Sequence, residues 1–583
     1  MRAGLLVVGR LLAALPLLYL ALCFFYPLLA ILRLSFAGGY AGPLRALGAP
    51  YYLGVVGFTF VQATLSTLLT LAVGLPGAYI FARYSFPGKG LLQAVAGVPF
   101  VMPTVVVAVA FGALLGPRGL LSQALAAAGL PVAPLRVGGL WLVLLAHVFY
   151  NYTVVLRLVG GFWASLDPRL EQAAAMLGAS RVRTLLHVTL PLLLPAVGAA
   201  ALLIFIFTFT SFGVIVILGG PRMATLEVEI YRQTAQLLRL DVAATLAMVQ
   251  IVCTLLLSLA YTRLAARSAI PLELQPRSAV ARRPRGVARL LVGANALLIL
   301  LLLGGPLLAL ALRSLIGPPG EGGPLTLAYY TALGENRTGS AFFVPPTAAL
   351  ANSLRIASTT MVIALLVGVP AAYLLAAPGS QQAHAPEQQS WNSHNGQGGR
   401  DRRRSAWPMA RVAVLDALFM LPLGTSAATL GLGYLVALST PGLGWLRTSP
   451  WLLPLLHSLV ALPFVVRALL PALRARSPRQ REAAAMLGAT PLQAWLRVEL
   501  PQIAPALAVG AIFAFTVSLG EFGATLLLTR PDQPTLPVMI FRFLGQPGAL
   551  NYGQALALST ILMLTTALGF VLLERVRPPG GEF

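Results

Sequence analysis

Twelve long apolar runs, separated by short loops rich in arginine, constrain the fold of this chain most. About 20 apolar residues suffice for a helix to cross the hydrocarbon core of a bilayer. The runs are continuous rather than alternating, which excludes a membrane β-barrel, and only 10% of the residues are charged, against about 25% in soluble domains. The sequence therefore predicts an all-α integral membrane protein. The runs cover about 11–32, 55–82, 91–115, 138–160, 192–218, 242–264, 289–312, 349–377, 409–437, 450–471, 502–528 and 551–573.

The formal net charge of +24 comes almost entirely from arginine. The arginines gather in loops between apolar runs, as expected where basic loops stay in the cytoplasm, so we expect contact with the lipid bilayer and no nucleic-acid partner. Placing the basic linker 265–288 in the cytoplasm puts both termini there as well. Cys23 and Cys253 lie inside apolar runs and the histidines form no cluster, so neither a metal site nor a cofactor is expected.

Two segments need separate interpretation. The N-terminus resembles a signal peptide, but it lacks a small-x-small cleavage site, and a first membrane helix is favoured. The polar insertion 378–408, with the basic run 400–404, has no apolar periodicity. Disorder is the default for such a composition, and contact with anionic lipid or a partner is the alternative.

An internal repeat divides the chain at an offset of 310 residues. Gln172–Gly178 reads QAAAMLG and Glu482–Gly488 reads EAAAMLG, and His147 aligns with His457. The sequence thus predicts two tandem six-helix halves, 1–264 and 289–577. Because each half has an even number of spans, the two copies share one orientation in the membrane.

The repeated loops, about 163–191 and 473–501, carry the clearest functional signal. Their alanines favour a short helix with a smooth face, and Gly178 and Gly488 suit a left-handed helix stop. Pro191 and Pro501 suit the first turn of the next membrane helix. Such a loop could transmit movement from a soluble partner, or it could be only an amphipathic tether. The identity of the two copies favours the first interpretation.

At these residues the chain resembles the permease subunits of bacterial binding-protein-dependent ABC importers, whose EAA loop carries a coupling helix. The second copy matches that motif, whereas the first has Gln172 in place of its glutamate and Glu171 one position early. The resemblance implies a type I ABC importer permease fold, duplicated, in the bacterial plasma (inner) membrane. The loop residues it assigns to coupling are Glu171, Gln172, Ala173, Ala174, Gly178, Ala179, Pro191, Glu482, Ala483, Ala484, Gly488, Ala489 and Pro501.

The same resemblance implies partners and a substrate class. Two copies of an ABC ATPase subunit would bind on the cytoplasmic side, and an extracytoplasmic solute-binding protein would deliver a small-molecule solute. The fused arrangement and the stretch 211–231 are most similar to thiamine permeases and then to iron(III) permeases. The tract 519–525 also resembles molybdate and sulfate permeases, so it does not select a solute.

The chain is not expected to be an enzyme. Its only lysine, Lys89, has Arg83 where a phosphate-binding loop needs glycine and Gly90 where it needs serine or threonine. ATP hydrolysis would therefore belong to a separate subunit. The alternative is a twelve-helix secondary transporter driven by an ion gradient, against which the paired loops and the few intramembrane carboxylates argue.

Candidate pathway or gate residues lie in the second part of the fifth apolar run of each half. Glu521 lies in an apolar run, where a carboxylate either faces the solute pathway or caps a helix end. The six candidates are Ser211, Phe212, Gly213, Glu521, Phe522 and Gly523. Glu227, Glu229, Arg232 and Asp241 are predicted in an outer loop, as a binding-protein contact or a solvated face, and His147 and His457 in the half of their spans nearest the repeated loops.

Overall fold

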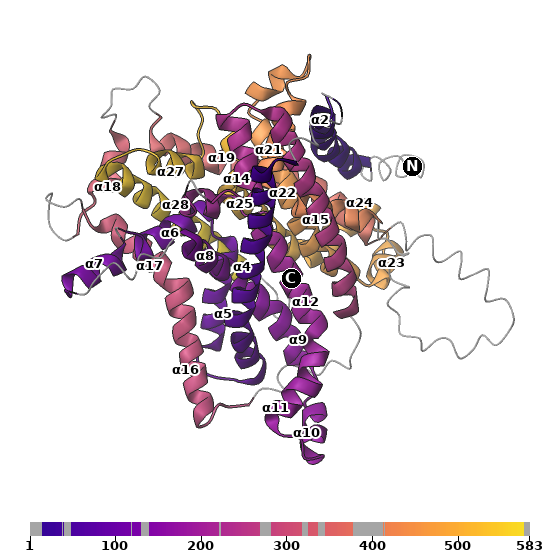
Figure 1. Cartoon of the computed structure of the whole chain (residues 1–583). Coiled ribbons are helices and arrows are strands. Elements are labelled where there is room, and N and C mark those ends of the chain that lie inside the picture. Colours follow the sequence, from indigo (N-terminus) through magenta and orange to yellow (C-terminus); the bar gives the residue numbers. More distant parts are fainter. Residues whose placement is uncertain are drawn as a thin grey trace. The chain divides into compact units, whose positions relative to one another are not determined.

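The computed structural model is helical throughout the part of the chain that it describes, and an isolated bridge joins Tyr84 to Arg282 (Figure 1). This confirms the all-α prediction. The insertion 378–408 and most of the linker 265–288 lie outside the described residues. The structure describes residues 14–37, 39, 48–117, 119–129, 139–220, 223–268, 282–317, 325–335, 344–376, 412 and 414–576.

Eleven described helices are long and apolar enough to span a membrane, and a pair bent by 95°, Val414–Gly424 with Ala427–Ala437, makes twelve if it is one span. Each overlaps one predicted run, although the third helix begins later than predicted and the two fifth helices begin about ten residues earlier. The third run of the first half is also interrupted, because 3-10 helix η2 and Pro103 separate α5 from α6. The eleven helices are Ala14–Ser35, Pro50–Arg83, Thr104–Ala127, Gly139–Ser165, Val182–Phe209, Leu240–Leu264, Val287–Leu315, Pro346–Leu375, Leu452–Arg474, Pro491–Gly520 and Ala549–Leu572.

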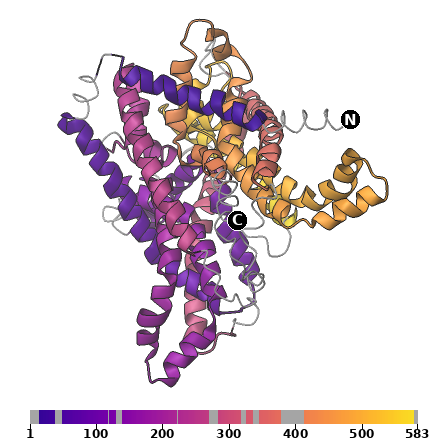
Figure 2. The same cartoon turned by 90° about the vertical axis from the view of Figure 1, so that its right-hand side faces the viewer.

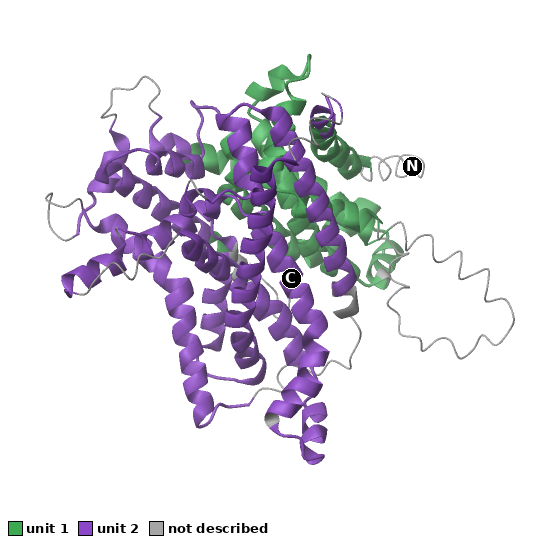
Figure 3. Ribbon diagram, viewed as in Figure 1, with its two compact units in different colours: residues 1–31, 350–529, 568–583 green, residues 32–349, 530–567 purple. Residues whose placement is uncertain are grey.

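Two compact units, described separately below, divide the chain (Figure 3). Unit 1 contains residues 1–31, 350–529 and 568–583, and unit 2 contains residues 32–349 and 530–567. The units cut across the sequence repeat, since the first span of the first half belongs to unit 1. The division into halves at the linker remains a prediction from the sequence.

Unit 2 is built around α4 (Pro50–Arg83), which packs against α8 (Gly139–Val154) and α12 (Leu190–Phe209). Val155, Trp163 and Ile204 contribute to the apolar core between them. The other first-half elements of this unit are α5 (Lys89–Gly97), η2 (Val98–Val101), α6 (Thr104–Leu115), α7 (Leu120–Ala127), η4 (Val155–Val159), α9 (Gly160–Ser165), α10 (Pro168–Met176), α11 (Arg181–Thr184), η5 (Leu185–Thr189), α13 (Gly213–Leu218), α14 (Leu226–Tyr231), η6 (Arg232–Gln236) and α15 (Leu240–Ser268).

Second-half helices also belong to unit 2. The Tyr152 hydroxyl of α8 donates a 3.1 Å hydrogen bond to Asn295 Oδ1, and α17 and α27 pack on α6. Since Asn295 lies in α16, the first span of the second half packs on the fourth span of the first. The second-half elements are α16 (Val287–Ile299), η8 (Leu300–Gly304), α17 (Gly305–Leu315), α18 (Ala328–Thr331), η9 (Ala332–Gly334), α27 (Leu536–Leu544) and most of α28 (Ala549–Val576).

Unit 1 shows the reciprocal exchange. Tyr19, in the first span of the chain, donates a 2.7 Å hydrogen bond to the carbonyl of Leu455 in α22, and its hydroxyl lies 2.7 Å from Ser458 Oγ. The first span of each half therefore packs against the fourth span of the other half. The unit's elements are η1 (Ala21–Phe25), part of α2 (Tyr26–Ser35), most of α19 (Pro346–Leu375), α21 (Ala427–Ala437), η12 (Gly444–Thr448), α22 (Leu452–Arg474), α23 (Pro478–Met486), α24 (Pro491–Ala494), η13 (Trp495–Glu499), α25 (Leu500–Gly520) and α26 (Gly523–Leu528).

Pro191 and Pro501 lie in the first turn of α12 (Leu190–Phe209) and α25 (Leu500–Gly520), as predicted. Each fifth span as a whole nevertheless begins about ten residues before the proline, at α11 or α24, and a π-helical turn, η5 or η13, ends two residues before it. A proline inside a helix removes one backbone hydrogen bond, and the wider π turn accommodates that loss. Both halves thus carry an irregular turn at the base of the fifth span.

Candidate functional site

Each repeated loop folds into a short helical hairpin, α10–α11 in the first half and α23–α24 in the second. Asp167 begins α10 by accepting a 2.9 Å hydrogen bond from the amide of Arg169. Figures 1 and 2 show α10 and α11 at one end of unit 2, beyond α9 and α12. We call these two elements the coupling hairpins.

Glycine ends the first helix of both hairpins in the predicted conformation. The φ angles are +81° at Gly178 and +80° at Gly488. The amide of the next residue, Ala179 or Ala489, donates a 3.0 Å bond to the carbonyl five residues back. This is the Schellman stop, in which a left-handed residue satisfies carbonyls that the helix leaves open. The two loops therefore share one backbone geometry.

The tip of each hairpin presents large apolar side chains to the surroundings. Met176 and Leu177 are 84% and 89% exposed, and Met486 and Leu487 are both 89% exposed. Of the coupling-loop alanines, Ala173 and Ala483 are exposed, Ala174, Ala179 and Ala489 are intermediate, and Ala484 is buried; Gln172, Glu482, Pro191 and Pro501 are exposed. Paired methionine and leucine tips outside the membrane spans are typical of a surface that a partner covers.

In the first half, Glu171 holds the hairpin to the membrane helices. Its Oε1 forms an ion pair with Arg83 at the end of α4, and it accepts a 3.1 Å hydrogen bond from Thr189 Oγ1 in η5. We call these three residues the first staple. Glu171 therefore faces inward, whereas Gln172 points to the surroundings.

In the second half, the acidic residue of the staple lies on the fifth span, whereas in the first half it lies on the hairpin. Glu499, the last residue of η13, forms an ion pair with Arg476, two residues beyond the end of α22, and lies 3.6 Å from Arg481 of α23. Tyr373 of α19 donates to Glu499 at 3.3 Å and accepts a 2.9 Å bond from the indole of Trp495. We call this group the second staple.

The two staples have opposite charge patterns at equivalent positions. The residue 310 positions after Glu171 is Arg481, and the residue 310 positions after Thr189 is Glu499. Each staple nevertheless ties the hairpin to the π turn at the base of the fifth span.

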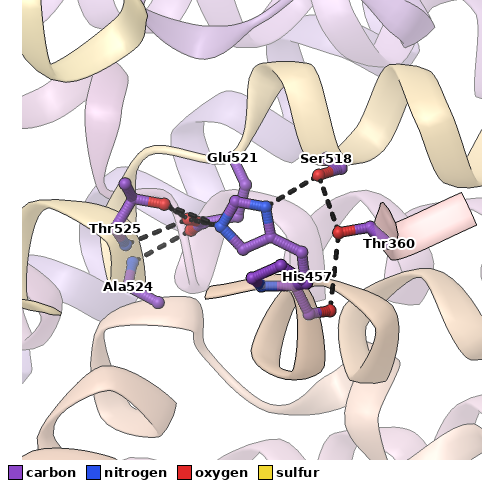
Figure 4. Close-up of polar contacts among 7 residues, drawn as sticks. Thr360, His457, Ser518, Glu521, Ala524 and Thr525 are labelled. Atoms are coloured by element: carbon purple, nitrogen blue, oxygen red, sulfur yellow. Dashed lines mark hydrogen bonds and ion pairs between the residues drawn. The ribbon is translucent and has the colours of Figure 1, made fainter. Parts of the chain in front are cut away.

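A histidine marks the opposite end of the fifth span. In unit 1, His457 Nδ1 lies 2.8 Å from Ser518 Oγ, and Nε2 lies 2.8 Å from Thr525 Oγ1 and 3.2 Å from Glu521 Oε2 (Figure 4). Ser518 in turn bonds Thr360 of α19 at 3.2 Å. The fourth span thus connects the second span to the break between α25 and α26.

Glu521 caps the helix that follows the break. Its Oε1 accepts a 2.9 Å bond from the amide of Ala524, and its Oε2 accepts a 3.0 Å bond from the amide of Thr525 as well as that residue's hydroxyl proton (Figure 4). The residue is 7% exposed. An anionic cap at a helix N-terminus, also paired with histidine, leaves little of this carboxylate for a solute.

The first half repeats this connection without the carboxylate. His147 Nδ1 lies 2.8 Å from Ser66 Oγ in α4, and its Nε2 lies 2.9 Å from Ser211 Oγ at the break between α12 and α13. His147 is 2% exposed. Its position, eight residues into the run Gly139–Ser165, lies nearer the end opposite the coupling hairpin, so the predicted location was wrong, as it was for His457.

The remaining gate candidates lie at these two breaks. Phe212 and Phe522 are the residues before α13 and α26, at 6% and 2% exposure. Gly213 and Gly523 begin those short helices and are buried. Gly431 approaches Ala524 so closely that a Cβ there would lie 3.0 Å from the Ala524 Cα. Each set is thus packed within its own unit.

Two carboxylates in unit 2 contradict the sequence interpretation. Glu227 and Glu229 are 0% and 1% exposed, so they are neither a solvated face nor an open docking surface. Glu229 accepts hydrogen bonds from Tyr51 at 2.9 Å and Gln233 at 2.6 Å. The sequence around these two residues does not predict their burial. The side chains that cover them come from α4 and α15, which are separate elements.

Comparisons with known proteins agree with this geometry. The model of the binding-protein-dependent transport system inner membrane component matches residues 74–269 and again residues 407–578. The Escherichia coli (strain K12) thiamine transport system permease protein ThiP is 27% identical over 540 residues, 90% of this chain and 89% of that protein. The Brucella abortus (strain 2308) ThiP is 27% identical over 531 residues, 88% and 87% of the two chains.

Another relative matches over a shorter stretch of the chain. The probable sulfate transport system permease protein cysT of Nephroselmis olivacea is 30% identical over 207 residues, 36% of this chain and 72% of that protein. The matched segments in this chain contain both coupling hairpins. The chain therefore belongs to the family of binding-protein-dependent transport system inner membrane components, with the family unit present twice in one polypeptide.

Proposed function

We propose that this permease imports thiamine. The chain is the multi-pass membrane subunit of an ABC importer, a transport component rather than an enzyme. Support for the solute comes from relatives named as thiamine permeases, which align over about nine-tenths of both chains at 27% identity. Iron(III), expected second, is not supported by these relatives.

The coupling hairpins carry the mechanistic part of the proposal. Two identical helix stops, two exposed Met-Leu tips and two staples favour one ATPase subunit under each hairpin, and thus two copies per chain. The hairpin face, both termini and the basic linker would lie in the cytoplasm, since the arginine-rich loops share that side. Closure of the ATPases would move both fifth spans through their π turns and rock the two halves between two states.

The breaks after α12 and α25 are the proposed gates. Ser211, Phe212 and Gly213 would form one, and Glu521, Phe522 and Gly523 the other. Because Glu521 is engaged by His457 and the start of α26, it would act by fixing that short helix rather than by binding the solute. The histidine connection would carry movement of the second and fourth spans to the gate.

Reconstitution tests this function directly. The chain is placed in liposomes with its ATPase subunit, ATP inside the vesicle compartment that the hairpins face, and a thiamine-loaded binding protein on the other side. We expect uptake of labelled thiamine that requires ATP and the binding protein, and no uptake of iron(III). Accumulation driven by an ion gradient without the ATPase would instead support the secondary-transporter alternative.

A further inference from the structure

The turn between η6 and α15 contains a strained leucine. Leu238 has a φ of +55°, and it is the one non-glycine residue with positive φ among those the structure describes. This left-handed conformation brings Cβ against the carbonyl and is costly for leucine, whereas glycine adopts it freely. The amide of Arg239 donates a 2.8 Å bond to the carbonyl of Gln233, which closes the end of η6 around Leu238.

The repeat shows that glycine can occupy this turn. The residue 310 positions later is Gly548, which precedes α28 and has a φ of +114°. Both halves therefore need a left-handed residue before their last span. The second half meets this need without strain, and the first half does not.

Burial of the Leu238 side chain does not offset the cost of its left-handed backbone. The Leu238 side chain is 76% exposed and that of Leu237 is 49% exposed, so neither contributes a full share of apolar burial to the fold. Arg239 and Asp241 on the same turn are also exposed. Charged neighbours on the same turn favour an aqueous position over one in the hydrocarbon core.

Within unit 2, the turn lies at the end of the membrane span opposite to the hairpin α10–α11. From Leu240, α15 runs for 29 residues to Ser268, a length of about 43 Å at 1.5 Å per residue, which is enough to cross a bilayer. The chain then returns at Arg282, which pairs with Tyr84 beside Arg83 of the first staple. A partner at the turn is therefore distinct from the ATPase.

We propose that Leu237, Leu238 and Arg239 form a docking knob for the extracytoplasmic solute-binding protein. The contact surface that this knob requires on the partner is apolar opposite the two leucines and acidic opposite Arg239. Strained backbone held at an exposed side chain is typical of a residue kept for its contacts with a partner. This inference rests on the proposed importer function, because it assigns a surface to one of its partners.

The decisive variant is Leu238→Gly, which relieves strain while removing the knob. The wild-type chain and the variant are purified with the ATPase subunit in nanodiscs, and ATP hydrolysis is titrated with the thiamine-loaded binding protein that stimulates the wild-type complex. We expect a five- to tenfold higher half-saturating concentration, an unchanged maximum, and a thermal unfolding midpoint equal to or above that of the wild type. Leu238→Asn, which tolerates the left-handed backbone but is polar, should behave like the glycine variant.

The control is Leu290→Ala, which shortens a leucine of similar exposure, 73%, in α16. It should leave the half-saturating concentration unchanged. A half-saturating concentration equal to that of the wild type in Leu238→Gly overturns the inference. If only the maximal rate of ATP hydrolysis falls, the inference is also overturned, because the turn then acts by another contact, such as one with lipid. If no solute-binding protein stimulates the wild-type complex, the proposed importer function itself fails.

Discussion

Removing the charge of Glu499 should uncouple ATP hydrolysis from transport. Glu499→Gln keeps the shape of the side chain and leaves an oxygen for the Tyr373 hydroxyl. It removes the charge that Arg476 pairs with at the base of the fifth span. The segment that leads into α23 then loses its ion pair with η13.

The free-energy cost of losing this ion pair follows from how deeply its two side chains are buried. The side chains of Glu499 and Arg476 are 11% and 21% exposed, so solvent screens their interaction little. A hydrogen bond to a charged group contributes about 1.5–3 kcal/mol, and we take about 2 kcal/mol for its loss. Arg481 is 67% exposed and adds little. A free-energy change of about 1.4 kcal/mol corresponds to a factor of ten in an equilibrium constant. The state in which the segment before α23 is separated from η13 therefore becomes about 30-fold more populated.

The assay compares two rates, thiamine uptake and ATP hydrolysis, in proteoliposomes that contain the chain and its ATPase subunit and are supplied with the thiamine-loaded binding protein. We expect thiamine uptake per ATP hydrolysed to fall several-fold in Glu499→Gln, while the ATPase subunit still co-purifies. The exchanged pair Arg476→Glu with Glu499→Arg should recover more uptake than Arg476→Glu alone, because the latter places two carboxylates together. Asp532→Asn serves as the control, since the Arg530–Asp532 pair is 45% and 54% exposed.

Two results would refute this reasoning. If Glu499→Gln transports at the wild-type rate with the wild-type ATP ratio, the staple does not transmit movement. If the ATPase subunit no longer co-purifies, Glu499 supports assembly of the complex rather than coupling within it. A matching test on the first staple, Glu171→Gln, should have a smaller effect, because Glu171 is 36% exposed.

Three further predictions concern the hairpins and the gate. The Gly488→Asn variant should transport thiamine, whereas the Gly488→Val variant should not. Nothing lies within 4 Å of a Cβ at this position, so the cost comes from the left-handed backbone, which asparagine tolerates and valine does not. Uptake assays on folded variants test this. Replacing Met486 and Leu487 by serine should leave the thermal midpoint unchanged and reduce ATPase co-purification, because both side chains are 89% exposed. Glu521→Ala should destabilise the protein by about 1–3 kcal/mol, since it leaves the buried amides of Ala524 and Thr525 without their acceptor, and a wild-type denaturation midpoint would contradict that role.

The membrane class, the twelve spans and the coupling hairpins were predictable from the sequence. Apolar length and charge asymmetry are local properties, and the 310-residue offset is visible without any contact. The glycine stops were equally local, because a left-handed residue after a short helix strongly favours Gly178 and Gly488. The exchange of first spans between the halves could not be predicted, since a lipid-facing and a partner-facing helix have the same apolar composition.

Pairings across long separations were decided by the tertiary structure. Glu171 meets Arg83 across 88 positions, and His457 meets Ser518 across 61; no periodicity specifies such contacts. The second staple was missed because its acid sits on η13 rather than in the motif. The sequence thus determined what each segment is, through hydrophobicity and backbone preference. Only the packed helices determined which polar groups are buried together, because burial of a carboxylate depends on neighbours that lie far away in the chain.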